Sequence, residues 1–444
     1  MAEPTPSAAA AAAPWWREPT RAQWTNYGAA WAGWVLDGFD FCVFLFAMRP
    51  IAKEFGVQLS STALSVTLTL LVRLLGGLLA GWLADRYGRR LPLMLSILWF
   101  AACDGAVYFA DSFTAILVLR TLFGFGMGAE WTAGSALAME SWPARSRGLA
   151  SGVLQGSFGI GYVLAAVAYA AVGEERWRTL FLIAAAPALL VVPIRLFVKE
   201  TRPPEPVREP PFDSADGRRP SATLRVNGLD QTVPSLFRRR VVWGSALYAL
   251  SFAVYYALVG NWAAMLQKEL GLPAAALPLP TLLFQLGMLV GAAAIGAAAS
   301  RFGVVRAQVV PLLLLLLALP LYVGAAGPGA GLWAGAALAG LLGAGISGVT
   351  PYLFAALFPA EVRARGFALV YHVGALFGGL TPFLVAWLAE TAPMPLRWAL
   401  AGAAALAALL VVGMLLVRPR GVLPPDVLGR SPVVVAPATS RRAL

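Results

Sequence analysis

Charged side chains stand inside the long apolar segments of this sequence, and they are the first candidates for chemistry. A charge placed in a membrane-like environment costs several kcal/mol, so a residue that carries one there is a functional candidate by default. All the candidates precede residue 200, which gathers the titratable groups into the first half of the chain. They are Asp37, Asp40, Arg73, Asp104, Arg120, Glu130 and Arg195.

Three acids of this set are candidates for proton coupling. Asp37 and Asp40 are three residues apart, so they share one face of a helix. Two neighbouring carboxylates in a low dielectric resist double ionisation, which favours a proton carrier here. The alternative is that both acids are fixed to arginines of neighbouring helices. Glu130 is a second proton site or, alternatively, the partner of Arg145 or Arg147.

Arg73 and Arg120 are candidates for holding a substrate carboxylate, because a guanidinium binds a carboxylate through two parallel hydrogen bonds. The alternative is a fixed ion pair, which for Arg120 would be with Asp40 or Asp104. At about 1.5 Å of helix per residue, Asp40 lies level with Arg120, and Asp37 lies level with Arg73. The depths predict two stacked pairs, in which an arriving carboxylate competes with Asp37 for Arg73.

A polar stripe also leads to one of these arginines. Thr62, Ser65, Thr69 and Arg73 recur at helical spacing within a single apolar segment. We expect this stripe to face a wet cavity rather than lipid.

Neutral polar side chains in the apolar segments are weaker candidates. Gln155 and Asn261 are assigned to substrate binding, although such amides more often link two helices. His372, the only histidine, is either a donor to substrate or a packing residue. The two cysteines, Cys42 and Cys103, both lie in apolar segments, so we expect no disulfide framework, no metal site and no cofactor.

The composition indicates that these segments lie in a membrane. With 59% hydrophobic and 13% charged residues and a mean hydropathy of +0.72, the chain is too apolar for a soluble globular protein. The net charge of +12 would suggest nucleic-acid binding in a soluble protein. In a membrane protein, an excess of Lys and Arg marks the cytoplasmic loops, so we expect no nucleic-acid partner.

Twelve apolar windows are long enough to span about 30 Å of hydrocarbon, which takes about 20 helical residues. The windows are 24–48, 62–83, 92–110, 113–138, 149–172, 177–198, 241–266, 277–299, 307–326, 330–356, 366–389 and 396–417. They predict an all-α membrane protein of twelve transmembrane helices. The expected organisation is a tail at 1–23, a six-helix bundle at 24–198, a linker at 199–240, a second bundle at 241–417 and a tail at 418–444.

The short polar turn at 81–90, which carries one acid and three arginines, separates two of the windows. Its positive charge places it on the cytoplasmic side and sets both termini on that side. A reduced copy at 296–303 keeps both glycines and one arginine. The copy indicates two pseudo-symmetric halves of six helices each.

The turn, its copy, the two sets of six spans and the basic linker together resemble the major facilitator superfamily. Within it, residues 36–41, 73–77, 126–131 and 140–143 resemble the sialate:proton symporter family. The resemblance implies a monomer in the bacterial inner membrane that takes up a small organic anion with protons. Lactate, pyruvate and sialic acid are the expected substrates. A proton-driven exporter and a non-transporting sensor are the alternatives.

The same resemblance implies a gating role for the turn at 81–90. Asp85 would meet the end of the eleventh transmembrane helix and help to close the cytoplasmic side. An acid suits a helix N-terminus because of the partial positive charge there. Arg86, Gly88, Arg89 and Arg90 complete this predicted gate, with the arginines anchored at the interface and paired with neighbouring loops.

Overall fold

The computed structural model describes residues 14–428 with gaps. Ser141, most of 187–222, and 227–228, 274–275, 360–361, 393 and 420 are not described. The predicted tails at 1–23 and 418–444, much of the linker and the second half of the sixth window therefore lie wholly or partly outside the described residues.

Six helices form the first half. They are α1 (Arg21–Phe55), α2 (Leu59–Tyr87), α3 (Arg90–Val107), α4 (Phe113–Glu140), α5 (Arg147–Val172) and α6 (Trp177–Ala184), with short 3-10 turns η1 (Trp15–Arg17) and η2 (Glu174–Arg176). Thr20 begins α1 with a capping box, in which its side chain and that of Gln23 each accept a bond from the other's backbone N–H. Gly56, at φ 63°, ends the same helix in the left-handed conformation that glycine adopts without strain.

The second half follows a two-stranded hairpin of β1 (Thr223–Val226) and β2 (Leu229–Thr232), which pair antiparallel. Its elements are α8 (Val233–Val259), α9 (Trp262–Lys268), α10 (Pro278–Phe302), α11 (Val304–Tyr322), α12 (Ala330–Leu342), η5 (Ala344–Val349), α13 (Thr350–Leu357), α14 (Arg363–Gly378), α15 (Thr381–Thr391), α16 (Leu396–Leu416) and η7 (Pro425–Leu428). Because α8 begins at Val233, the helix starts earlier than the predicted boundary at 241.

Three predicted spans of this half are broken helices. The first consists of α8 and α9, the second of α12, η5 and α13, and the third of α14 and α15. Pro351 and Pro382 stand in the first turns of α13 and α15, where a missing backbone N–H costs least. The apolar windows gave the length of these spans correctly but could not show the breaks.

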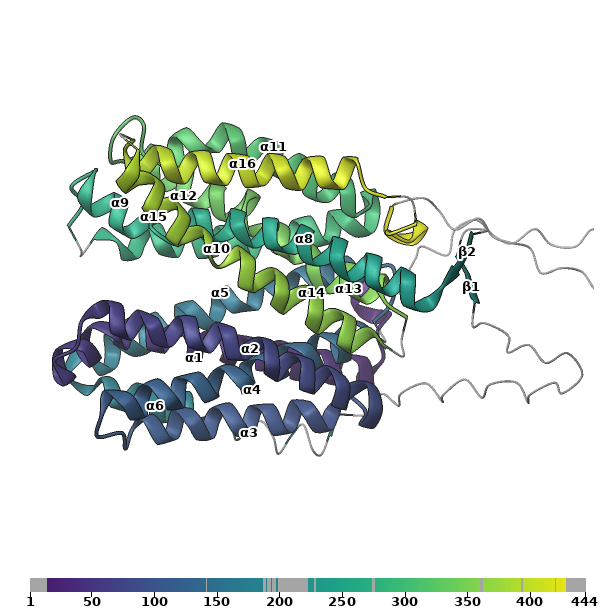
Figure 1. Cartoon of the computed structure of the whole chain (residues 1–444), viewed down its shortest axis with the longest axis horizontal. Coiled ribbons are helices and arrows are strands. Elements are labelled where there is room, and N and C mark those ends of the chain that lie inside the picture. Colours follow the sequence, from purple (N-terminus) through teal and green to yellow (C-terminus); the bar gives the residue numbers. More distant parts are fainter. Residues whose placement is uncertain are drawn as a thin grey trace, which may run out of the picture.

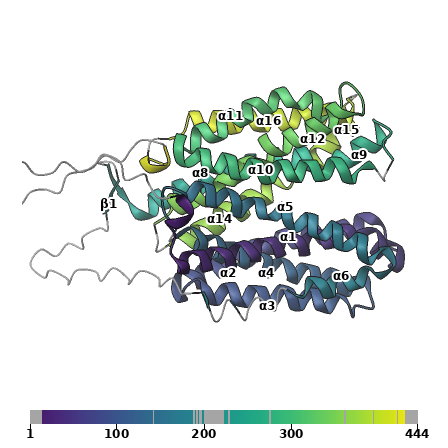
Figure 2. The ribbon, with the colours of Figure 1, turned by 180° about the vertical axis from the view of Figure 1, so that it is seen from behind.

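Ten helical stretches in the described part are long and apolar enough to cross a membrane. The other two predicted spans are the first and the sixth. Helix α1, with 35 residues, is the first, and α6 is the described start of the sixth. The predicted fold of twelve helices in two halves is confirmed. Figures 1 and 2 show the halves side by side, with α1 to α6 in one bundle and α8 to α16 in the other.

Glycines allow the halves to approach each other closely where α5 crosses α10. A Cβ added to Gly152 would lie 2.0 Å from the Ala292 carbonyl oxygen, and one added to Gly296 would lie 2.3 Å from the Gly148 carbonyl oxygen. Neither distance is compatible with a side chain, so small residues set this crossing. The same crossing places Gln155 of α5 and Gln285 of α10 beside the central cavity.

Candidate functional site

A cavity of about 490 Å³ lies between the two halves, within the usual size of small-molecule sites. Both halves contribute to its wall. Aromatic rings dominate the lining: Trp34, Phe41, Phe158, Tyr162, Tyr248, Phe252, Tyr255, Tyr256, Trp262, Phe284 and Tyr371. Among the described residues that line it, Arg73 carries the only formal charge.

Arg73 of α2 is the charged group of this wall, and its side chain is buried, at 7% exposure. Its guanidinium carbon lies 5.7 Å from the centre of the Trp34 ring and 5.2 Å from that of Tyr371. A terminal nitrogen, Nη2, lies 3.9 Å from Asp37 Oδ2, so the predicted pairing of these two residues is present. Within the described part, Nε and Nη2 of Arg73 have no hydrogen-bond partner. These two donors lie on one edge of the guanidinium.

Of the two acids considered as partners of Arg120, Asp104 is the one that pairs with it. Its Nη1 donates to Asp104 Oδ1 at 2.6 Å, and its guanidinium carbon lies 3.9 Å from the centre of the Phe123 ring. The predicted Asp40–Arg120 pair is therefore wrong. Asp104 lies on α3, which packs against α4, and the depth count gave the height of Asp40 but not the direction in which Arg120 points. Arg120 lies outside the lining of the cavity.

Asp104 and Arg120 form a buried pair whose loss should destabilise the protein. We expect Asp104→Asn to lower the free energy of unfolding by about 3 kcal/mol, because an uncompensated buried charge remains. Thermal unfolding of the purified protein in detergent measures this. The double variant Asp104→Asn with Arg120→Gln should recover part of the loss. A double variant less stable than both single variants would contradict a purely pairwise role.

Asp40 has no ion-pair partner among the described residues. The side chain is fully buried, and neither carboxylate oxygen has a hydrogen-bond partner among the described residues. Glu130 is in a similar position, at 1% exposure with an unpartnered Oε2. Arg147 donates to the Trp142 carbonyl oxygen from Nε and Nη2, and the pairing of Glu130 with Arg145 or Arg147 stays a prediction.

The polar stripe on α2 divides between two environments. The Thr69 hydroxyl lies 2.7 Å from the Ser65 carbonyl oxygen and 2.8 Å from that of Arg120, so this part of the stripe packs against α4. Thr62 is fully buried, and of the four residues only Arg73 lines the cavity. The prediction that the whole stripe faces a wet cavity is wrong, because its small side chains serve the close contact of α2 with α4.

The three neutral candidates differ in position. Gln155 lines the cavity. The Asn261 amide donates to the Pro382 carbonyl oxygen at 2.7 Å, which joins the break between α8 and α9 to α15. His372 is 2% exposed and its Nε2 lies 3.3 Å from the Gly128 carbonyl oxygen, which links α14 to α4 across the two halves. The positions of Asn261 and His372 are those of packing residues, and neither lines the cavity.

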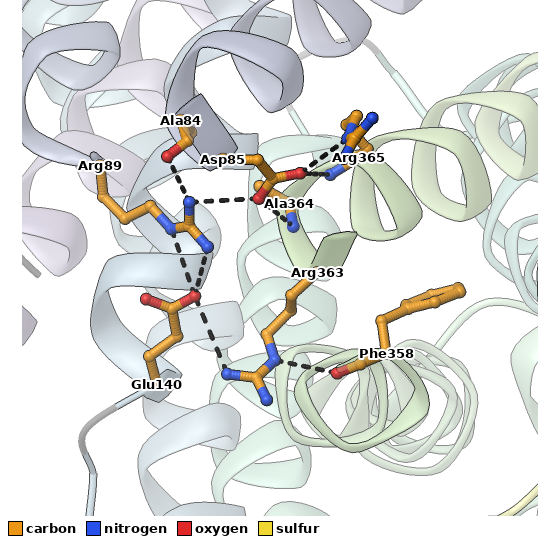
Figure 3. A network of polar contacts seen from close by, with 8 residues as sticks. All are labelled: Ala84, Asp85, Arg89, Glu140, Phe358, Arg363, Ala364 and Arg365. Atoms are coloured by element: carbon orange, nitrogen blue, oxygen red, sulfur yellow. Dashed lines mark hydrogen bonds and ion pairs between the residues drawn. The ribbon is translucent and has the colours of Figure 1, made fainter. Parts of the chain in front are cut away.

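The turn at 81–90 contacts the start of α14, as Figure 3 shows. Asp85 accepts hydrogen bonds from the backbone N–H groups of Ala364 at 3.2 Å and Arg365 at 3.1 Å, and from Arg365 Nε at 3.1 Å. It therefore caps the N-terminus of α14, where a negative charge is favoured. We call the face of the molecule that contains the turn at 81–90 and the start of α14 the basic face.

Arginines extend this contact in two directions. Arg89 is buried and bridges Asp85, at 3.1 Å, to Glu140 at the end of α4, at 2.7 Å, and Arg363 lies 3.8 Å from the same Glu140 (Figure 3). Arg86 instead lies over the Trp82 ring at the surface. The expectation that all these arginines anchor at the interface is thus wrong for Arg89.

The connection between the end of α2 and the start of α3 is short. Gly88, at φ 95°, allows the turn that follows the helix, because a side chain is strained there. Arg90 is the first residue of α3. Together they place Arg89 between Asp85 and α4.

Further hydrogen bonds join the halves at the basic face. Ser151 donates to the Gly348 carbonyl oxygen at 2.6 Å and accepts from the Tyr352 backbone N–H at 2.9 Å, while the Gly148 N–H donates to the Ser300 hydroxyl at 2.8 Å. The cavity extends toward the opposite face, where Trp262 and Pro382 line it. The structure is closed at the basic face.

The Asp85 contact leads to a testable expectation. Asp85→Asn should leave the protein inserted and folded but shift its balance toward the state that is open at the basic face, because charge-assisted bonds to α14 and Arg89 are lost. Single cysteines placed near the two faces, reacted with a membrane-impermeant thiol reagent, measure this shift. Asp111→Asn, an exposed acid of the same half, is the control. Unchanged accessibility at both faces would contradict a latch at Asp85.

Two helical halves around a central cavity, joined at one face, define a multi-pass membrane transporter. The model of the Major Facilitator Superfamily matches residues 30–282, more than half of the sequence, and the chain belongs to this superfamily.

Several characterised or named proteins are similar to the chain. A probable 4-methylmuconolactone transporter of Cupriavidus pinatubonensis is 36% identical over 42% of this chain, but the match spans less than half (45%) of that protein. The sialic acid transporter NanX of Escherichia coli is 28% identical over 81% of this chain and 85% of its own length. A cis,cis-muconate transport protein of Acinetobacter baylyi is 28% identical over 54% of this chain and 57% of its own length.

Solved structures share the fold. The proton:xylose symporter XylE is 18% identical with a TM-score of 0.70, covering 91% of this chain and 98% of that one. The human organic anion transporter MFSD10 is 19% identical with a TM-score of 0.69, covering 88% of this chain and 99% of that one.

Proposed function

We propose that the protein is a secondary transporter that takes up an organic anion together with protons by alternating access. The observation that carries this proposal is Arg73, the single charged group among the described residues of the cavity wall, with two donors on one edge free of hydrogen bonds. A carboxylate accepts from such an edge through two parallel bonds. The relatives named for muconate and sialic acid support an organic acid as substrate.

The balance of buried charge supports proton coupling. Within the described spans of the first half, the buried carboxyl groups outnumber the buried guanidinium groups by two: Asp37, Asp40, Asp104 and Glu130 against Arg73 and Arg120. The buried Arg89 belongs to the turn at 81–90, and Arg195 lies outside the described residues. Because unpaired charge is costly in this environment, protons are the simplest means of neutralising the excess. Asp40 and Glu130, whose Oδ1, Oδ2 and Oε2 atoms have no hydrogen-bond partner in the described part of the chain, are the groups that need them.

Asp37 couples the substrate to the proton in this scheme. A carboxylate that binds Arg73 competes with Asp37, which lies 3.9 Å from the same guanidinium. A buried acid that loses its cationic partner binds a proton more readily. Substrate binding would then itself load the proton, and Asp40 and Glu130 would relay or store it.

We further propose a monomer in the bacterial inner membrane with the basic face in the cytoplasm, as the basic turn at 81–90 favours. Closure of that face by Asp85 makes the state described here outward-facing. Bacterial relatives with transport functions support this location.

Uptake into proteoliposomes tests the proposed function. Labelled lactate, pyruvate, sialic acid and cinnamate are offered under an inward proton gradient, and each is also offered without a gradient. We expect gradient-driven accumulation of at least one acid, with an Arg73→Gln protein as the matched control. A non-transporting sensor would move none of these acids. A proton-driven exporter would move its substrate in the direction opposite to the inward flow of protons, so the substrate would not accumulate inside.

A further inference from the structure

We infer, resting on the transport function proposed above, that the substrate is a flat aromatic or conjugated carboxylic acid with a hydrogen-bond donor at the end remote from the carboxylate. Three features of the cavity lead to this class: its aromatic wall, the edge of Arg73 that has no hydrogen-bond partner among the described residues, and a set of amide oxygens that likewise have none. Each feature constrains a different part of the ligand.

The aromatic wall selects a flat ligand. Rings from both halves, among them Trp34, Phe158, Tyr255 and Tyr256, surround a volume of about 490 Å³. Flat π-systems pack well against such rings. A lactate molecule would leave most of this volume unfilled. A polyhydroxylated acid such as sialic acid would place several hydroxyl groups against a wall that is mostly apolar, where the few polar groups cannot replace all the hydrogen bonds lost to water.

Arg73 fixes how the carboxylate approaches. The rings of Trp34 and Tyr371 lie within cation–π distance of its guanidinium, at 5.7 and 5.2 Å, and Asp37 lies near Nη2. The donors without hydrogen bonds, Nε and Nη2, point along one edge in the plane of the group. A carboxylate must therefore bind edge-on, between ring-lined walls. A molecule whose π-system is conjugated with its carboxylate is flat throughout. It can therefore bind Arg73 edge-on and also fit between the rings.

A second polar part of the cavity wall comes from helices other than the one that carries Arg73. Gln155 of α5, Gln285 of α10 and Gln308 of α11 all line the cavity, and each has a buried Oε1 without a hydrogen-bond partner in the described structure. Leaving a buried acceptor unsatisfied is costly, so a ligand O–H or N–H group would be favoured there. Arg73 belongs to the first half, whereas Gln285 and Gln308 belong to the second. One ligand with two poles would thus bind both halves.

Binding to the purified protein, measured by isothermal titration calorimetry, tests this class of substrate. The probes are benzoate and cinnamate, each with and without a para-hydroxyl group, together with lactate and sialic acid. We expect the hydroxylated aromatic acids to bind about five- to tenfold more tightly than their parents, which corresponds to one net hydrogen bond. Lactate and sialic acid should bind more weakly than either parent.

Variants of the amides test this second polar part of the cavity wall. Gln155→Met, Gln285→Met and Gln308→Met keep the approximate size of the side chain. At least one of them should lose the preference for the hydroxylated acid while its affinity for cinnamate stays within about twofold of the wild type. Retained cinnamate affinity shows that the cavity is intact. Gln267→Met, at an exposed position of α9, is the control and should keep the preference.

Two results would overturn the inferred substrate class: lactate or sialic acid binding more tightly than cinnamate, or all three cavity variants keeping the hydroxyl preference. In either case, Arg73-dependent binding of lactate or sialic acid would leave the proposed transport function standing. If Arg73→Gln binds every acid as the wild type does, or if no acid binds, both proposals fail. The two failures are therefore distinguishable.

Discussion

Replacing Arg73 by Gln should weaken binding of an organic anion about tenfold to a hundredfold, the largest effect of any single change in the cavity. The variant removes one charge-assisted pair, which contributes about 1.5–3 kcal/mol. The apparent Michaelis constant for uptake and the dissociation constant should rise together, whereas the amount of protein in the membrane should change little. Arg73→Lys should recover only part of the loss, because an ammonium lacks the planar fork that binds both carboxylate oxygens.

Two controls separate this effect from a general defect. Arg178→Gln removes another arginine of the first half, one that pairs with Glu54 and does not line the cavity. The double variant Arg73→Gln with Asp37→Asn removes both partners of the ion pair, so no unpaired carboxylate remains at position 37. If this variant also binds weakly, the lost affinity comes from the missing guanidinium and not from an unpaired acid. Normal affinity in Arg73→Gln would exclude Arg73 as the anion ligand and return Arg120 and His372 to consideration.

Asp37→Asn should abolish accumulation driven by a proton gradient while leaving substrate exchange in place. The side chain can no longer take up a proton when the substrate engages Arg73, but the cavity keeps its guanidinium. Accumulation under a gradient and counterflow exchange without one, both in proteoliposomes, measure the two activities separately. Asp40→Asn should impair accumulation less completely, because it is Asp37, and not Asp40, that pairs with Arg73 among the described residues and is displaced by the substrate.

The matched control for this prediction is Asp111→Asn, which removes an exposed acid of the same half. It should accumulate substrate as the wild type does. Full pH-dependent accumulation by Asp37→Asn would contradict the coupling scheme. Glu130, which is buried and has an unpartnered carboxylate oxygen, would then be the next acid to test.

The sequence was sufficient to predict the fold, because long apolar segments indicate membrane-spanning helices directly. Windows of about 20 apolar residues have few other uses, and the charged turn at 81–90 divides two of them. The contact of Asp85 with the start of α14 joins residues 279 apart, and only resemblance to a family could indicate it. The pairing of Asp37 with Arg73 followed from equal depth in adjacent helices.

The parts of the site that could not be predicted depend on the direction in which a side chain points around its helix. Equal depth suggested Asp40 for Arg120, but rotation of α4 turns Arg120 toward Asp104. The aromatic wall of the cavity could not be predicted from the sequence, because aromatic residues are common in apolar spans whether or not they line a cavity. Gln308 stands at the start of its predicted span, where a polar residue suggests only a helix end, and no pattern in the sequence placed it in the cavity.

Proton uptake on substrate binding tests the coupling between Asp37 and Arg73 most directly. Purified protein in weakly buffered detergent solution is mixed with 4-hydroxycinnamate, and in parallel with lactate, while a pH indicator reports the free proton concentration. Calorimetry shows whether each acid binds. We expect the acid that binds to make the solution more alkaline with the wild type, and to leave the pH unchanged with Asp37→Asn. Binding without proton uptake in the wild type, or equal uptake in Asp37→Asn, would contradict the mechanism.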